Sequence, residues 1–162
     1  GSLAAGRVVE LLEESDGWYR IENGYISTEY VTIVDPSQIS KGQEIADYAL
    51  QFVGYPYVYG GSSPKGFDCS GFVCWVYTAS GVHNLPRTTA QGIYNQCARV
   101  SPSEAKPGDL IFFTGTYDSG VPVSHVGIYV GDNKMLHCGN PIQYADITSS
   151  YWSQHFYAFG RL

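Results

Sequence analysis

The stretch Gly66-Phe67-Asp68-Cys69-Ser70-Gly71-Phe72-Val73 decides the fold. A loop rich in glycine, serine and proline ends at Cys69, and an apolar segment with helical spacing follows it, over residues 69–78. Cys69 therefore lies at a junction between a loop and a helix. The unpaired N–H groups and the dipole of a helix N-terminus favour negative charge, so we expect this thiol to ionise more readily than a free one.

A nucleophilic cysteine needs a base, and the hairpin predicted over residues 123–138 offers two histidines. Its first strand alternates, with His125 and Gly127 on one face. A three-residue turn with Asn133 in the left-handed conformation would place His137 opposite Gly127. The two histidines would then be diagonal neighbours, with their Cβ atoms about 6–8 Å apart. A two-residue turn would put them on opposite faces.

This arrangement predicts a catalytic set. His125 would take the proton of Cys69, and His137 would hold the other ring nitrogen of His125. The alternatives are a cysteine that only packs and histidines that are only structural. Two histidines on one face near a prepared thiol favour the catalytic interpretation, whereas His83 and His155 lack such a setting.

Composition excludes several classes of function. The 162 residues include nine basic and fifteen acidic ones. A chain without a basic patch is a poor nucleic-acid binder, so we expect no nucleic-acid partner. No apolar run reaches the roughly 18 residues that a membrane span requires. The sequence has no signal-peptide pattern, and Gly1-Ser2 resembles a remnant of tag removal, so we expect the natural start to lie elsewhere.

The other cysteines, Cys74, Cys97 and Cys138, are interpreted as packing residues. No CxxC pair occurs, and the spacing fits neither a disulfide scaffold nor a standard zinc site. Zinc held by mixed cysteine and histidine ligands is the remaining alternative. We expect neither a metal nor another cofactor.

Short strands are predicted near the N-terminus, over residues 7–12, 18–21, 24–26 and 30–34. Asp16-Gly17 and Glu22-Asn23-Gly24 are hairpin turn signals between them. Helices are predicted over residues 41–53, ended by Gly54, over residues 70–79, and from Thr88 or Thr89 to Gln96. Residues 110–113 form a further predicted strand. Tyr55 and Tyr59, beside the glycine loop, are expected to lie as a lid over the core rather than as a substrate wall.

Several motifs occur together and in a fixed order. They are Pro56-Tyr57-Val58-Tyr59-Gly60-Gly61, Asp68-Cys69-Ser70-Gly71-Phe72, Leu85-Pro86-Arg87-Thr88-Thr89-Ala90-Gln91, Pro107-Gly108-Asp109-Leu110, Ser124-His125-Val126-Gly127-Ile128-Tyr129 and Met135-Leu136-His137. With them the chain resembles the NlpC/P60 family of papain-like cysteine peptidases from bacterial cell walls. The resemblance implies an α+β fold, with N-terminal helices packed on an antiparallel sheet, over residues 37–162. Residues 1–36 resemble the second half of a bacterial SH3-like domain, a small all-β segment.

The resemblance also implies roles for individual residues. Cys69 is expected to be the nucleophile, His125 the base, His137 the orienting residue and Tyr57 a hydroxyl near the oxyanion. The residues expected to shape the site or to contact substrate are Asp68, Ser70, Arg87 and Ser124. Whether Arg87 and Gln91 are structural or face the substrate stays open.

The reaction that the resemblance implies is hydrolysis of peptidoglycan stem peptides, or of muropeptide fragments, between D-γ-glutamate and the following L-diamino acid. It also implies secretion or an envelope location in a bacterium, with cytoplasmic recycling as an alternative. Family members joined to SH3-like domains often prefer a free L-Ala amine. Two rival functions remain: a thiol amidase or transferase acting on another acyl substrate, and a catalytically silent wall-binding module.

Overall fold

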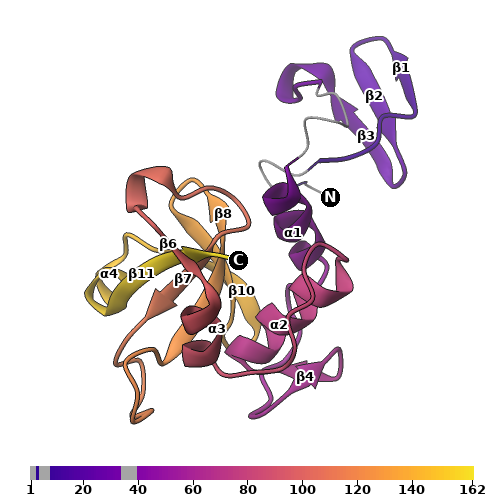
Figure 1. Cartoon of the computed structure of the whole chain (residues 1–162). Coiled ribbons are helices and arrows are strands. Elements are labelled where there is room, and N and C mark those ends of the chain that lie inside the picture. Colours follow the sequence, from indigo (N-terminus) through magenta and orange to yellow (C-terminus); the bar gives the residue numbers. More distant parts are fainter. Residues whose placement is uncertain (1–2, 4–7, 34–39) are drawn as a thin grey trace. The chain divides into compact units, whose positions relative to one another are not determined.

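A computed structural model describes Leu3, residues 8–33 and residues 40–162 of the chain (Figure 1). The chain divides into two compact units, Gly1–Ser40 and Lys41–Leu162. Each unit has its own secondary structure and is described by itself.

The first unit contains a three-stranded antiparallel sheet in the order β1-β2-β3, which spans Glu13–Ser15, Trp18–Ile21 and Gly24–Ser27. The turn at Asp16-Gly17 has positive φ angles of 49° and 80°, as the hairpin signal predicts. The predicted strand over residues 7–12 is wrong for its described part, residues 8–12, which is irregular. The SH3-like character of this unit stays a prediction.

The predicted strand over residues 30–34 is also wrong in its described part. The chain instead forms a 3-10 helix, η1, over Thr28–Tyr30. The hydroxyl of Ser27 accepts a hydrogen bond from the backbone N–H of Glu29 at 3.3 Å, which turns the chain out of the sheet. Val34 lies outside the described residues.

The second unit is built on a six-stranded sheet in the order β10-β9-β8-β7-β11-β6, with every neighbouring pair antiparallel. A separate two-stranded sheet pairs β4 with β5 just before Cys69. The strands are β4 (Ser62–Ser63), β5 (Gly66–Phe67), β6 (Ala98–Val100), β7 (Leu110–Phe113), β8 (His125–Gly131), β9 (Lys134–Cys138), β10 (Ile142–Asp146) and β11 (Phe156–Arg161). The predicted strand at residues 110–113 is confirmed.

The helices of this unit are α1 (Lys41–Leu50), α2 (Cys69–Ala79), α3 (Ala90–Gln96) and α4 (Ser150–His155), with a 3-10 helix, η3, at Pro102–Glu104. Thr89 caps α3 by accepting a hydrogen bond from the N–H of Gly92 at 3.0 Å, as predicted. Helix α1 ends before its predicted boundary, and turns lead on to Gly54 with a φ angle of 90°. Helix α4 was not predicted.

The sheet buries both of its faces. One face packs against α1 and α2 through residues such as Leu110, Phe112 and Ile128, all of them fully buried. The other face carries a smaller cluster of Ile111, Phe113, Met135 and Phe159, onto which Trp152 of α4 packs. This arrangement of helices and antiparallel sheet confirms the α+β class (Figure 1).

The β8–β9 hairpin sets which face the histidines share. Its turn is the two-residue Asp132-Asn133, both with positive φ, and not the expected three-residue turn. A bulge between Tyr129 and Gly131 inserts one unpaired residue and corrects the register. His137 therefore lies opposite Gly127, and the predicted pairing is confirmed although the predicted turn is wrong.

A buried ion pair ties the last strand to the turn before β7. Asp109 is 2% exposed and accepts hydrogen bonds from Arg161 Nε at 2.6 Å and Nη2 at 2.7 Å. The backbone N–H of Lys106 donates to the same carboxylate at 2.9 Å. The carboxylate thus joins two segments that are distant in sequence, and its charge depends on one guanidinium.

We predict that Arg161→Met lowers the free energy of unfolding at pH 7 by about 2–3 kcal/mol, because it leaves the Asp109 charge buried without a partner. The value lies below that for a fully buried pair because Arg161 is partly exposed. Urea unfolding checks the prediction. Lys134→Met, which removes the same charge from an exposed site, serves as the control, and an equal effect of both substitutions would contradict the account.

Candidate active site

The start of α2 is fixed by a carboxylate that three groups share. Asp68 is the N-cap, and its Oδ1 accepts hydrogen bonds from the Gly71 N–H at 2.7 Å and the Ser70 hydroxyl at 3.2 Å. Its Oδ2 accepts from Arg87 Nη2 at 2.5 Å. Arg87 Nη1 also donates to the Ser70 hydroxyl at 2.7 Å. The residues on both sides of Cys69 are therefore held by one network.

Gly71 explains why the first turn of α2 can lie so close to the glycine loop. A Cβ at Gly71 would lie 2.0 Å from the carbonyl oxygen of Gly61, a distance no side chain tolerates. The Asp68 N–H donates to the same Gly61 carbonyl at 3.0 Å. The loop and the helix N-terminus therefore form one rigid junction, with Cys69 as the first helical residue.

His125 and His137 meet on the face of the sheet away from α2. The two ring nitrogens, Nε2 of His125 and Nδ1 of His137, are 3.0 Å apart, and the rings cross at 82°. Gly127 leaves room for this contact, since a Cβ there would lie 3.2 Å from the His137 Cβ and 2.8 Å from the Met135 sulfur. The hairpin brings the two predicted histidines together.

The Cys69 thiol lies near the start of strand β8. The residue is partly exposed. Burial, followed by the nearby Asp68 carboxylate, raises the pKa of the Cys69 thiol to about 11, and the backbone groups of Val126, the residue after His125, and of Ser70 offset only part of that effect. The expectation of an easily ionised thiol is therefore wrong: burial outweighs the helix N-terminus.

Both imidazoles are neutral at working pH. Burial, followed by the proximity of His137, lowers the pKa of His125 to about 3. Burial alone lowers the pKa of His137 to about 4. His125 retains some accessible surface, whereas His137 is 5% exposed. The site at rest thus holds an uncharged thiol and two uncharged rings.

Two tyrosines lie near the thiol. Burial raises the pKa of Tyr57, and the negative charges that Cys69 and Asp68 carry when ionised raise it further, so the phenol lies within electrostatic range of both. Tyr117 shows the same pattern, with burial first and then Cys69 and Tyr59. Tyr117 was not predicted, because a single tyrosine in a polar loop carries no periodic signal.

The expected lid of tyrosines over the core forms only in part. Tyr55 packs against the main core cluster, as expected. Tyr59 is 92% exposed, so its predicted place over the core is wrong. Its phenol is close enough to Tyr117 to affect the pKa of that residue, on the solvent side of the glycine loop.

Ser124 lies at a different place from that expected of a substrate contact. It is fully buried, and its hydroxyl contacts the Thr116 Oγ1 at 2.6 Å and the Thr116 N–H at 3.0 Å. We therefore assign Ser124 the role of holding the loop over residues 114–122. The expected contact between Ser124 and substrate is not possible for a fully buried side chain. Gln91 supports the same loop by accepting a hydrogen bond from the Val123 N–H at 3.0 Å.

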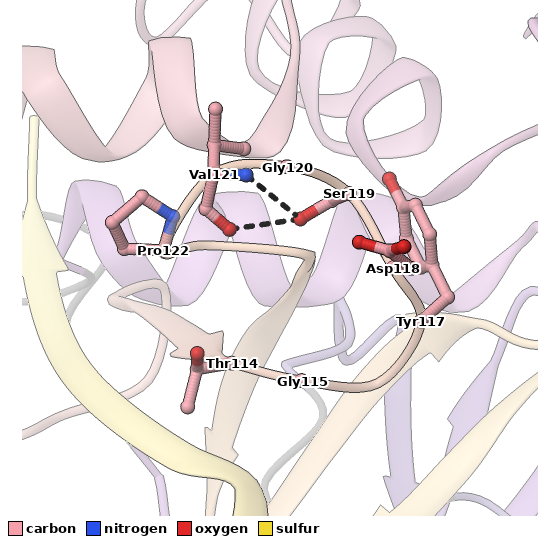
Figure 2. A pocket seen from close by; sticks show the side chains of 8 residues that line it. All are labelled: Thr114, Gly115, Tyr117, Asp118, Ser119, Gly120, Val121 and Pro122. Atoms are coloured by element: carbon pink, nitrogen blue, oxygen red, sulfur yellow. Dashed lines mark hydrogen bonds between the residues drawn. The ribbon is translucent and has the colours of Figure 1, made fainter.

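This loop encloses an open hollow of about 570 Å³ (Figure 2). Within the loop, the hydroxyl of Ser119 hydrogen-bonds the backbone of Val121. The hollow is lined by Thr114, Gly115, Tyr117, Asp118, Ser119, Gly120, Val121 and Pro122. None of the predicted site residues lines it.

In the part of the chain that the structure describes, no three histidine, cysteine, aspartate or glutamate side chains gather as metal ligands would. Across these same ranges, no helix combines the length and apolar character needed to cross a membrane.

The sequence profile of the NlpC/P60 family matches residues 54–161, which include the junction at Cys69 and both histidines. The chain belongs to the NlpC/P60 family. Its first unit lies outside the match.

Named relatives agree with this membership. The bifunctional muramidase/DL-endopeptidase CwlT of Bacillus subtilis is 47% identical over 116 residues, which cover 70% of this chain and 34% of CwlT. The probable endopeptidase p60 of Listeria seeligeri is 44% identical over 115 residues, covering 70% of this chain and 21% of p60. The chain thus spans about a third or less of the length of these two relatives.

A solved structure shows the same fold. The crystal structure of an NLP/P60 family protein from Staphylococcus aureus, described as similar to a lipoprotein, superposes with a TM-score of 0.71 at 40% identity. The likeness covers 86% of this chain and 52% of the other.

We predict that alkylation of Cys69 by iodoacetamide accelerates about tenfold for each pH unit between pH 7 and 10, because the thiolate fraction is small below a raised pKa. Mass spectrometry of the peptide that contains Cys69 measures the rate, and Cys69→Ala gives the background from the buried cysteines. A rate that has already levelled off at pH 7 would contradict the neutral thiol.

Proposed function

We propose that this chain is a cell-wall cysteine peptidase that hydrolyses the bond between D-γ-glutamate and the L-diamino acid of peptidoglycan stem peptides. Cys69 is the nucleophile, His125 the base and His137 the residue that orients it. The proposal is supported by family membership and by relatives named as endopeptidases. It places the protein outside the cytoplasm of a bacterium or at its envelope.

One observation carries the proposal. The Nε2 of His125 is engaged by His137, so Nδ1 is the nitrogen left to accept a proton. The backbone of Val126, the residue after His125, lowers the pKa of the Cys69 thiol, which supports a position of the sulfur near the start of β8. Nucleophilic catalysis requires a base with one nitrogen fixed and the other available to a nearby thiol.

The first half of the reaction forms an acyl-enzyme. As the sulfur attacks the γ-amide carbonyl carbon, the thiol proton passes to Nδ1 of His125 and a C–S bond forms. Negative charge develops on the carbonyl oxygen, where the N–H groups of the first turn of α2 and the Tyr57 hydroxyl are the donors. The C–N bond then breaks, and His125 returns the proton to the leaving amine.

The second half regenerates the thiol. Water gives a proton to His125 and attacks the thioester carbonyl, and the C–S bond breaks as the proton passes to the sulfur. The products are a peptide that ends in a free D-glutamate γ-carboxylate and a peptide with a free amine on the diamino acid. The neutral thiol at rest fits this scheme, because proton transfer to His125 accompanies attack instead of preceding it.

Arg87 and Asp68 are proposed to face the substrate beside the thiol. Both retain exposed surface, with side-chain exposures of 38% and 15%, and they form an ion pair at 2.5 Å. Ser70, which is 5% exposed, supports that ion pair because its hydroxyl accepts a hydrogen bond from Arg87. A guanidinium at this place suits the carboxylates of a stem peptide.

We expect Cys69→Ala to abolish hydrolysis and to leave the melting temperature nearly unchanged, because the thiol is placed for reaction more than for packing. Turnover of a defined muropeptide and a thermal unfolding curve measure the two effects. As a matched control, Cys97→Ala alters a buried cysteine away from the site and should retain turnover. Appreciable hydrolysis by Cys69→Ala would remove the assignment.

A digest of defined muropeptides tests the proposed bond. The wild-type chain and Cys69→Ala are incubated with stem peptides whose L-Ala amine is free or blocked. The masses of the fragments are then measured by mass spectrometry. The expected fragments are one that ends in D-glutamate and one that begins with the diamino acid. Cuts at other amides, or transfer products, would indicate the amidase or transferase, and intact stems with retained binding would indicate a silent wall-binding module.

A further inference from the structure

Trp152 covers the histidine pair with its indole ring. The ring stacks on His125, with centroids 5.4 Å apart and planes inclined by 25°, and meets the edge of His137 at 4.9 Å. On its other side it contacts Phe113 at 4.6 Å. No other side chain in the described part of the chain has ring contacts to both histidines.

Helix α4 is held in this place by its own contacts. The Nδ1 of His155 lies 2.7 Å from the carbonyl oxygen of Thr114, and the Thr114 N–H donates to the His155 carbonyl at 2.8 Å. Tyr151 packs its ring on both His155 and Trp152. The indole is therefore anchored to the end of β7 independently of the histidines that it covers.

Few other charged groups lie around the His125–His137 pair. The titratable groups around it are Cys69 on α2, Tyr151 and His155 on α4, and Tyr129 on β8 itself. Strand β7 faces the pair with Phe113, and β10 places the uncharged Gln143 opposite His137. The alternation of the strands directs Tyr144 and Asp146 of β10, and Lys134 and Cys138 of β9, to the opposite face. None of these groups is a cause of the lowered pKa of His125, and the only charge effect on that ring comes from His137.

We propose that Trp152 is a positioning residue that keeps water from the His125–His137 hydrogen bond and so holds both imidazoles neutral in mildly acidic solution. This inference rests on the proposed function, in which His125 must be unprotonated to accept the thiol proton. Without the indole, water reaches both rings, each becomes easier to protonate, and protonation of His125 stops its action as a base.

The sign of the effect depends on two opposing contributions. An indole face attracts an imidazolium, which by itself raises the pKa of the histidine by about 1.5. Burial lowers the pKa of a histidine by up to about 3 to 5 when it is complete. Exclusion of water is the larger contribution, so removal of the ring raises the histidine pKa values.

The test compares the wild-type chain with Trp152→Leu, Trp152→Phe and the control Gln154→Ala, an exposed position on the same helix. Histidine titration is followed by NMR in the Cys69→Ala background, and the pH dependence of kcat/KM is measured with Cys69 intact. We expect Trp152→Leu to raise the pKa of the two histidines by at least one and to move the acid limb of kcat/KM upward equally. Trp152→Phe should give a smaller shift in the same direction, and Gln154→Ala none.

The readouts separate this inference from the proposed function. An unchanged titration in Trp152→Leu, with activity reduced equally at every pH, would overturn the inference and indicate packing alone. If Trp152→Leu does not fold, Trp152→Phe decides by the same criterion. If the wild-type chain hydrolyses no stem peptide, the proposed function fails, while the histidine titration still decides whether Trp152 excludes water.

Discussion

The hydrogen bond between His125 Nε2 and His137 Nδ1 is the interaction on which the site depends. It occupies one nitrogen of His125 and so determines which nitrogen is left for the role of base that we propose. In many catalytic triads the third residue is a carboxylate, which orients the base and also stabilises its charged form. A neutral imidazole supplies a dipole instead of a charge, so the orientation of His125 relies more on packing. The cover of Trp152 and Phe113 provides that packing.

The proposed reacting groups belong to two parts of the fold that are held in place by different contacts. The junction at Cys69 is fixed by the Asp68 carboxylate and by a glycine contact that excludes any side chain. The histidines are fixed by strand pairing, in which a single bulge decides the face of the sheet. In the proposed mechanism, both sets of groups are held by local contacts before the substrate binds, which reduces the reorganisation that proton transfer requires.

Much of this could be predicted from the sequence. The apolar segment after Cys69 and the alternation around His125 identify α2 and β8, because each pattern reflects a single element with one buried side. The pairing of His137 with Gly127 was right for a partly wrong reason, since the sequence did not reveal a bulge that compensates for a shorter turn. The role proposed for Trp152 could not be predicted, because it depends on ring contacts across three elements. In addition, α4 is a short helix without a periodic pattern. The raised pKa of Cys69 was missed for a related reason: the helix N-terminus is visible in the sequence, whereas the burial around the sulfur is a property of the tertiary structure.

The account is tested most directly by the protonation of individual ring nitrogens at pH 7.5. If His125 presents Nδ1 to the thiol, its proton must be on Nε2, where it is donated to His137 Nδ1, and His137 must then carry its own proton on Nε2. Nitrogen-15 spectra of the two imidazoles in the wild-type chain distinguish these states. The account predicts two neutral rings, each protonated at Nε2. A proton on Nδ1 of His125, or a doubly protonated ring, would contradict it.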